Sequence, residues 1–240
     1  MSQQIYSNVA PLSSEVHKDY KLKPLNNITF AKEIQSCPVA DMEFFPCAQS
    51  HPILFTSLED GGDGMAMALM GIESQKNSYV NDDGQWEAGT YLPAFLRRYP
   101  FIMMKDDKND RMVVALDMDF EGVNQEEGQA LFAEDGEPTE FMNGAMKFMQ
   151  DYFVAIQRTQ NFIKRLDELE LLEDANFNWE YQGKKSTFTG FKRINEQKLD
   201  SLEEDVQLEL FKSGYYKLIV AHLISLRKFQ DLVDRKIKAD

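Results

Sequence analysis

One stretch of the chain, residues 86–101, concentrates five aromatic side chains and two prolines around the adjacent arginines Arg97 and Arg98. Large rings are stabilised by burial, and a cation among them needs a carboxylate or a bound anion, because an unpaired buried charge is unstable. Carboxylates are in excess, since the chain has a formal net charge of −14. The stretch therefore predicts either a structural ion pair at the centre of the fold or a site that recognises an anion.

The balance of 40 acidic against 26 basic residues also limits the partners of the protein. Such a chain repels the phosphates of nucleic acids and anionic lipid surfaces, so neither is expected to bind. Its longest apolar runs, such as residues 65–70 and 218–221, are much shorter than the roughly 20 residues that cross a bilayer. We expect no membrane insertion.

Cysteine usage and the first residues bear on the compartment. Cys37 and Cys47 are the two cysteines, and their spacing matches neither a redox CxxC motif nor half of a zinc site. We expect two buried, reduced thiols. The first twenty residues have neither the basic leader nor the apolar core of a secretory signal, so we expect a cytoplasmic protein.

Clusters of glycine, proline, asparagine and aspartate interrupt the first 138 residues at 60–64, 81–84, 106–110 and 134–138. Such clusters are typical of turns, and short apolar or alternating runs lie between them. The expected strands are residues 52–56, 66–70, 101–104 and 112–120, with hairpin connections at 81–84 and 106–110. This part predicts a mostly antiparallel sheet with a few short helices.

From residue 139 the apolar residues recur at steps of three, four and seven, which is the pattern of an amphipathic helix. The stripe consists of Met142, Met146, Met149, Phe153, Ile156, Ile163 and Leu166. Thr139 follows a proline and is a suitable N-cap. We predict one helix over residues 139–171, with its methionine-rich face in the core.

The last third of the chain predicts a hairpin and further helices. Residues 177–181 and 186–194 flank a glycine turn and have aromatic anchors. The next helix begins at Asn195 or at Ser201, the latter with a capping box, and Gly214 ends it. One final helix has a continuous apolar stripe of Tyr215, Ile219, His222, Leu226, Phe229 and Val233.

No internal repeat or low-complexity linker separates these parts. The predicted fold class is therefore α+β, as one domain over residues 1–240. Its strand-rich part, 1–138, supplies an antiparallel sheet that packs against the long helix and the further helices of the helix-rich part, 139–240.

Three acidic residues form the strongest metal-like pattern. Asp117, Asp119 and Glu121, followed by a glycine, match the opening of a calcium loop, but the bidentate glutamate at the twelfth position is missing. On a strand the three carboxylates share one face. They indicate either a calcium site or, more simply, the solvated face of a sheet edge.

Two histidines lie in informative places. Cys47 and His51 are four residues apart, a spacing that brings a thiol and an imidazole to one side of a helix, as a nucleophile pair requires. No orienting third residue is recognised, so two structural residues are the simpler interpretation. His222 lies on an apolar stripe and is expected to be a hydrogen-bonded core histidine.

For Arg97 and Arg98 two interpretations stay open. Either they form an ion pair with an acidic residue such as Glu43 or Asp117, or they bind the carboxylate or phosphate of a ligand. Adjacent residues on an extended segment point to opposite faces, which favours the structural interpretation. A ligand site would also use the neighbouring rings of Trp86, Tyr91 and Tyr99.

Several blocks of this sequence carry a resemblance to a known family. They are residues 43–44 with 52–55, 84–86, 91–101, 131–132 with 135–136, and 221–226. In these blocks the chain resembles the bacterial SapC family, which takes its name from a component associated with a paracrystalline surface layer. The resemblance implies a link to such a layer and supplies no catalytic residues.

These observations favour a non-enzymatic accessory protein that binds a protein or small-molecule partner through residues 86–101 or the groove between them and the long helix. A second hypothesis is an enzyme or sensor with an arginine and aromatic pocket for an anion. The third is a surface-layer accessory protein that assembles with calcium. No cofactor motif is recognised, and the sequence leaves homo-oligomerisation open.

Overall fold

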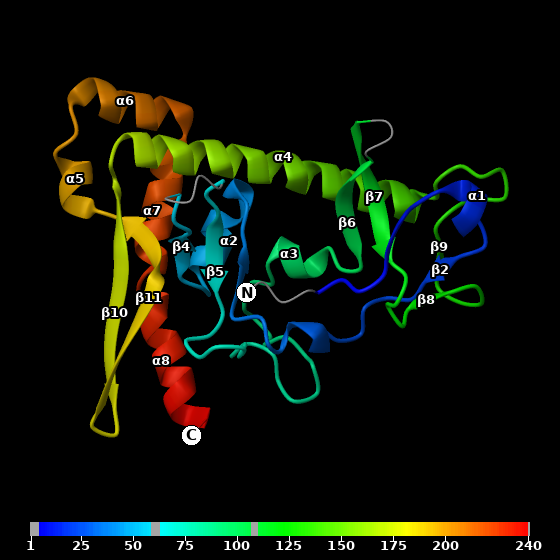
Figure 1. The fold of residues 1–240 in the computed structure, drawn as a ribbon, viewed down its shortest axis with the longest axis horizontal. Coiled ribbons are helices and arrows are strands. Elements are labelled where there is room, and N and C mark those ends of the chain that lie inside the picture. The colour runs from blue at the N-terminus through cyan, green and yellow to red at the C-terminus, as the bar shows by residue number, and fades with distance from the viewer. Residues whose placement is uncertain (1–4, 59–62, 107–109, 240) are drawn as a thin grey trace.

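The computed structural model describes residues 5–58, 63–106 and 110–239. Within these ranges one long helix, α4 (Glu140–Glu168), runs along the molecule and contacts three separate β-sheets (Figure 1). Every strand pair in these sheets is antiparallel. The α+β class is confirmed, with three sheets in place of one.

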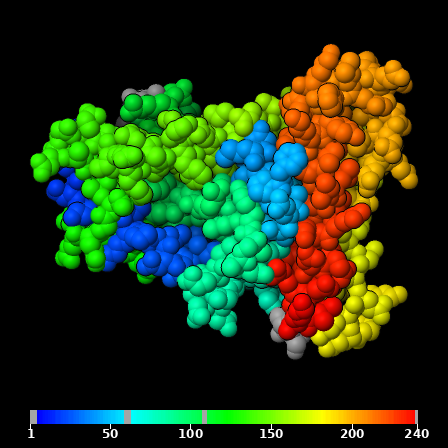
Figure 2. Space-filling model, turned by 180° about the vertical axis from the view of Figure 1, so that it is seen from behind, coloured from blue at the N-terminus to red at the C-terminus, as the bar shows by residue number. Residues whose placement is uncertain are grey.

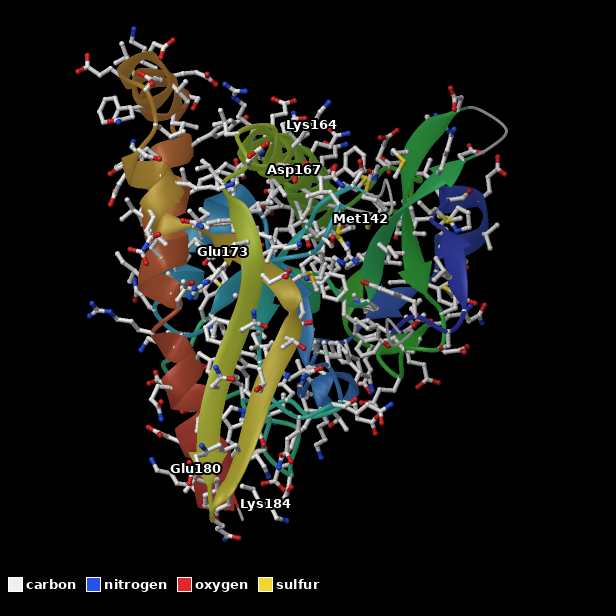
Figure 3. The ribbon with its side chains drawn as sticks, turned by 60° about the vertical axis from the view of Figure 1, so that its left-hand side comes forward. Met142, Lys164, Asp167, Glu173, Glu180 and Lys184 are labelled. Carbon is white, nitrogen blue, oxygen red and sulfur yellow. The ribbon has the colours of Figure 1, made fainter. Side chains whose placement is uncertain are left out.

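The largest sheet has the strand order β10-β11-β4-β5-β3. Its strands are β3 (Ser36–Pro38), β4 (Ile53–Phe55), β5 (Ala66–Leu69), β10 (Leu172–Tyr181) and β11 (Lys184–Ile194). The strands expected at 52–56 and 66–70 are β4 and β5. The expected hairpin is β10 and β11, which are longer than the sequence indicated and carry Glu180 and Lys184 at their tip (Figure 3). Because β11 pairs with β4, the second half of the chain completes a sheet of the first half.

The second sheet has the order β1-β7-β6, with β1 (Val9–Pro11), β6 (Phe101–Asp106) and β7 (Arg111–Asp117). The expected hairpin of β6 and β7 is confirmed by their pairing from Phe101 with Leu116 to Asp106 with Arg111. Most of its connection, and most of the turn expected at 60–64, lies outside the described residues. The strand expected over 112–120 is too long, because the chain turns after Asp117.

Shorter elements complete the first half. A third sheet has the order β8-β2-β9, formed by β2 (Lys21–Leu22), β8 (Val123–Asn124) and β9 (Gln129–Ala130). The short helices are α1 (Ser14–His17), η1 (Thr29–Ala31), η2 (Asp41–Glu43), α2 (Phe44–Ala48) and α3 (Ala94–Arg97). The hairpin expected around 81–84 is reduced to a single bridge between Val80 and Trp86.

Helix α4 begins where the sequence predicts. The Thr139 hydroxyl accepts a hydrogen bond from the Met142 backbone N–H at 3.2 Å, which satisfies one of the free donors of the first turn. At 1.5 Å per residue the helix is about 43 Å long. Its stripe is largely core, as expected: Met142, Met149, Ile163 and Leu166 are buried, and Met146, Phe153 and Ile156 are partly buried.

Four helices form one end of the molecule, as Figure 2 shows from behind: α5 (Glu196–Asp200), α6 (Glu204–Ser213), α7 (Tyr215–Ser225) and α8 (Lys228–Ala239). Asn195 caps α5 and Gly214 ends α6, as expected. The capping box at Ser201 is wrong, because Ser201 lies at the C-terminal end of α5. The final helix is divided into α7 and α8, although its stripe still faces the core.

One core joins the two halves of the chain. It contains Ile28, Phe55 and Leu69 from the first half together with Phe162, Ile219 and Val233 from the second. Side chains from both halves of the chain are therefore packed in the same core. No helix in the described ranges is both long and apolar enough to cross a membrane.

Candidate ligand-binding groove

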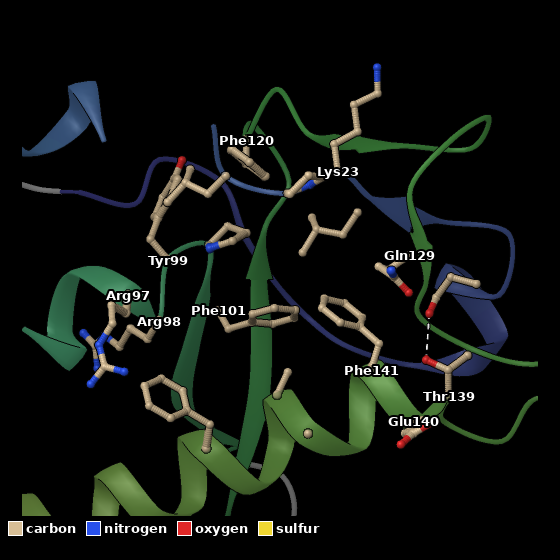
Figure 4. A pocket seen from close by; sticks show the side chains of 18 residues that line it. Lys23, Arg97, Arg98, Tyr99, Phe101, Phe120, Gln129, Thr139, Glu140 and Phe141 are labelled. Atoms are coloured by element: carbon tan, nitrogen blue, oxygen red, sulfur yellow. Dashed lines mark hydrogen bonds between the residues drawn. The ribbon is translucent and has the colours of Figure 1, made fainter. Parts of the chain in front are cut away.

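An open groove of about 930 Å³ lies between the segment that follows α3 and the N-terminal part of α4. Its walls come from residues 22–25, 97–101, 120, 129–130, 139–141, 144–145 and 148. Arg97 and Arg98 lie at one end, Gln129 and Thr139 lie at the other, and the rings of Phe101 and Phe141 lie between them (Figure 4). The volume is within the range of about 300–1,000 Å³ that is typical of small-molecule sites.

The floor of the groove is one face of α4. Phe141, Gly144, Ala145 and Phe148 are three, four and seven residues apart, a spacing that places side chains on the same side of a helix. Two small residues thus lie between two phenylalanines. A Cβ atom built on Gly144 would meet no heavy atom of the described residues within 4 Å, so the hollow reaches the helix itself.

The opposite wall is held by ring packing. Tyr99 contacts Phe30 with 4.4 Å between ring centroids and Phe120 with 5.4 Å. Burial raises the pKa of Tyr99 to about 12, and the nearby Asp117 carboxylate acts in the same direction. Tyr99 is therefore a neutral phenol at physiological pH and adds no charge to this wall.

Arg97 supplies a positive charge at the end of the groove. Its guanidinium lies 5.7 Å from the centre of the Tyr91 ring and 5.6 Å from that of Phe148, and Nη2 donates to the Tyr91 hydroxyl at 3.1 Å. In the described part of the chain, no carboxylate lies within ion-pair distance of it. The side chain is exposed, so donors remain available to a ligand.

Neither arginine forms the ion pair that the sequence suggested. The Glu43 carboxylate is buried, and it accepts hydrogen bonds from the Ala40 N–H at 2.9 Å, the Ala94 N–H at 2.6 Å and the Tyr91 hydroxyl at 2.9 Å. Asp117 is also buried and binds backbone N–H groups. The Tyr91 hydroxyl stands between Glu43 and Arg97 in place of a direct contact.

Arg98 is held differently from its neighbour. Its guanidinium lies 4.5 Å from the centre of the Phe95 ring and 5.4 Å from that of Tyr152, and its buried Nε has no hydrogen-bond partner in the described ranges. Arg98 separates the groove from a smaller hollow of about 220 Å³. The segment was expected to be extended, but it is helical through Arg97, which is why both arginines reach the groove and yet contact different rings.

The other rings of the 86–101 stretch pack elsewhere. Trp86 stacks on Tyr79, with 5.4 Å between centroids and 16° between planes, and its Nε1 donates to the Thr90 carbonyl at 3.3 Å. Tyr91 is engaged with Glu43 and Arg97. Of the five proposed binding residues, Arg97, Arg98 and Tyr99 line the groove, whereas Trp86 and Tyr91 do not.

Cys47 and His51 are both buried structural residues in this arrangement. His51 Nε2 donates to the Tyr91 carbonyl at 2.7 Å, and burial lowers the pKa of His51 to about 4. Burial, together with the nearby Cys37 and Glu43, raises the pKa of the Cys47 thiol well above its usual value. Neither group has the protonation state of an activated nucleophile pair. As expected, Cys37 and Cys47 are buried and not bridged.

His222 is the core histidine that the sequence predicts. Its Nδ1 donates to the Ile53 carbonyl at 2.8 Å, and its Nε2 accepts from the Ile194 N–H at 3.1 Å. The ring thus connects β4 and β11 to α7. Burial lowers the pKa of His222 to about 3.

The three acidic residues of the calcium-like pattern are not brought together. Asp117 ends β7 and accepts backbone N–H groups of Ser7 at 3.2 Å and Asn8 at 3.0 Å, so it is not solvated as expected on a sheet edge. Asp119 accepts from the Asn8 side chain, and Glu121 is exposed. No group of three or more acidic, histidine or cysteine side chains suited to a metal ion occurs among the described residues.

Sequence reasoning missed the floor of the groove. The signal was present as the pattern of Phe141, Gly144, Ala145 and Phe148, which runs beside the methionine stripe on α4. A glycine between two large rings on one helical face predicts a hollow on the surface of the helix.

These features define an α+β protein with an open apolar groove that carries cationic side chains at one end. The sequence model of the SapC family matches residues 12–232, which include the entire groove, and the chain belongs to the SapC family. No curated protein and no solved structure gave a significant match to the chain.

Proposed function

We propose that this SapC-family chain is a non-enzymatic binding protein that holds a small organic anion in the groove. The ligand has an apolar body that lies on Phe101, Phe141 and Phe148, and an acidic group that binds Arg97. The observation that carries the proposal is the Arg97 guanidinium, which stands at the end of an apolar groove with a phenol as its hydrogen-bond partner and no paired carboxylate among the residues that the structure describes. An acid from the ligand completes this arrangement.

The lining supports binding over covalent chemistry. Its side chains, all within the described ranges, include neither histidine nor cysteine. The Thr139 hydroxyl is already used, since it donates to the Ala130 carbonyl at 2.7 Å and accepts from Met142.

The unbridged thiols favour a reducing compartment, and we place the protein in the cytoplasm.

A matched pair of fluorescent probes tests the proposal. 1-Anilinonaphthalene-8-sulfonate carries an anionic group on an apolar ring system, and N-phenyl-1-naphthylamine is its neutral counterpart. We expect saturable binding of the anionic probe, weakened about tenfold or more in Arg97→Gln, because a hydrogen bond to a charged group contributes roughly 1.5–3 kcal/mol. The neutral probe should bind both proteins within about twofold of each other.

Arg111→Gln is the control. Arg111 is an exposed arginine on β7 that does not line the groove. The Arg111→Gln substitution removes the same charge as Arg97→Gln and should leave the affinity for the anionic probe unchanged. Circular dichroism establishes that the variants are folded. Equal affinity of the anionic probe for the wild-type protein and Arg97→Gln, or no saturable binding at all, would contradict the proposal.

A further inference from the structure

Gly144 lies within α4, where glycine is a poor helix former compared with alanine. Two other glycines of the chain have packing reasons: a Cβ on Gly71 would collide with the Lys76 carbonyl oxygen, and one on Gly64 would lie 2.6 Å from an Ile163 side-chain carbon. At Gly144 there is no such neighbour within 4 Å, and its φ is not positive. The packing of the described residues therefore does not require glycine at this position.

The groove provides a different reason for glycine at position 144. Gly144 lines it together with Ala145, between Phe141 and Phe148. Any side chain larger than hydrogen would project into the hollow where it reaches the helix. Glycine here leaves room for a molecule that lies against the α4 backbone.

The charges around the groove limit the ligand to one acidic end. Arg97 and Arg98 stand together at one end. At the other, Lys23 is paired with Glu127 at 2.5 Å and its ammonium points away from the groove (Figure 4), while the Glu140 carboxylate lies on the rim. A second acidic group on the ligand would meet Glu140 and, among the described residues that line this end, no available cation, so a monoanion fits best.

The shape of the groove favours a chain over a compact ring. From Thr139, the N-cap of α4, to Phe148 the groove follows the helix for about 14 Å at 1.5 Å per residue. A one-ring acid would occupy only a fraction of about 930 Å³. An unbranched chain anchored at Arg97 can run past Phe148 and Phe101 toward Gln129.

We propose that the groove takes a long-chain monocarboxylate and that Gly144 is the residue that sets this specificity, by letting the chain lie against α4. This inference rests on the proposed function and gives its ligand class. The carboxylate binds the guanidinium of Arg97, and the methylene groups replace water over the phenylalanine rings.

The test is isothermal titration calorimetry with octanoate, decanoate and dodecanoate, and with benzoate and 2-naphthoate as ring acids. The wild-type protein should bind the chain acids with affinity that rises with length, and the ring acids more weakly. Gly144→Ala should bind dodecanoate at least about tenfold more weakly while its unfolding midpoint without ligand rises by about 2–4 °C, because alanine is the better helix former. Gln150→Ala, an exposed site on α4 that does not line the groove, should leave the affinity unchanged.

The outcomes separate this inference from the proposed function. If dodecanoate binds equally to the wild-type protein and Gly144→Ala, the role of Gly144 is overturned and the anion-binding function stands. If ring acids bind and chain acids do not, the ligand class is wrong. If the wild-type protein binds neither these acids nor the anionic naphthalene probe, both proposals fail.

Discussion

Tyr91 and Glu43 are joined by a hydrogen bond of 2.9 Å in which the phenol donates to the buried carboxylate, and the same phenol oxygen accepts from Arg97 at 3.1 Å. The three groups form a chain of hydrogen bonds from the core to the groove. Burial raises the pKa of Tyr91, and Glu43 adds to this effect, so the phenol keeps its proton. Tyr91 therefore fixes Arg97 in place without neutralising it, which a direct contact with Glu43 would do.

Removing this phenol oxygen is expected to weaken the fold. In Tyr91→Phe, Glu43 Oε1 retains the Ala94 N–H but loses its second donor, and Arg97 loses its partner. We expect the free energy of unfolding to fall by about 1–2 kcal/mol, as for a buried acceptor that loses one donor. Urea unfolding followed by circular dichroism measures this. Tyr216→Phe, at an exposed tyrosine of α7, should change the free energy of unfolding by less than about 0.5 kcal/mol. An equal loss in both variants would argue against a stabilising role of this hydrogen-bond chain.

Acid is expected to destabilise the protein through its buried histidines. The pKa of His51 is lowered to about 4 and that of His222 to about 3, from 6.5 in the unfolded chain. At pH values between the folded-state and unfolded-state pKa values, the unfolded protein binds more protons than the folded protein. The contribution of the neutral histidines to the free energy of unfolding is therefore fully present above about pH 6.5 and falls as the pH decreases. From pH 7 to pH 5 the two histidines together should lower the free energy of unfolding by roughly 3–4 kcal/mol.

Urea unfolding at both pH values measures this change. His222→Gln should remove about half of it, because one proton fewer is taken up on unfolding. Gln150→Ala, at an exposed side chain of α4 that does not titrate, should leave the change as it is in the wild-type protein. A pH dependence that is the same in His222→Gln and the wild-type protein would show that His222 is not the group that titrates.

The thiols are expected to be inert in the native state. Burial raises the pKa values of Cys37 and Cys47 well above the usual value, so little thiolate is present at pH 8. Iodoacetamide labelling followed by intact-mass spectrometry should find no modification of the native protein within an hour and two modifications in guanidinium chloride. Rapid labelling of native Cys47 alone would instead support the Cys47 and His51 nucleophile pair.

Local signals predicted most of the fold. The period of the apolar residues on α4, the Thr139 cap and the Gly214 stop act within one or two turns of a helix, so they are visible in sequence. The end of β7 was not predicted, because Asp117 captures backbone N–H groups of Ser7 and Asn8, more than a hundred residues away. The sheet of β2, β8 and β9 was missed for a similar reason, since two-residue strands have no periodicity to detect.

The groove was half predictable. The density of rings around Arg97 and Arg98 indicated a site, and Tyr99 lines it with them. Trp86 is separated from these residues because its indole stacks on Tyr79, which lies seven residues earlier and outside the 86–101 stretch. The sequence also did not predict that Arg97 lacks an ion pair with Glu43. That depends on tertiary contacts, because the Glu43 carboxylate accepts its hydrogen bonds from Ala40, Tyr91 and Ala94 and from no arginine of the described residues.

The last prediction concerns the calcium-like pattern. Asp117 is expected to stabilise the fold as a cap for the N-terminal segment, since its carboxylate accepts from Ser7, Asn8 and Asp119. Asp117→Asn places an amide donor against these N–H groups, so the free energy of unfolding should fall by about 1–3 kcal/mol. Asp119→Asn, which alters one exposed contact with Asn8, should cost less than about 1 kcal/mol. Calcium should leave the unfolding midpoint of the wild-type protein unchanged; a rise that both substitutions abolish would instead establish a calcium site at these residues.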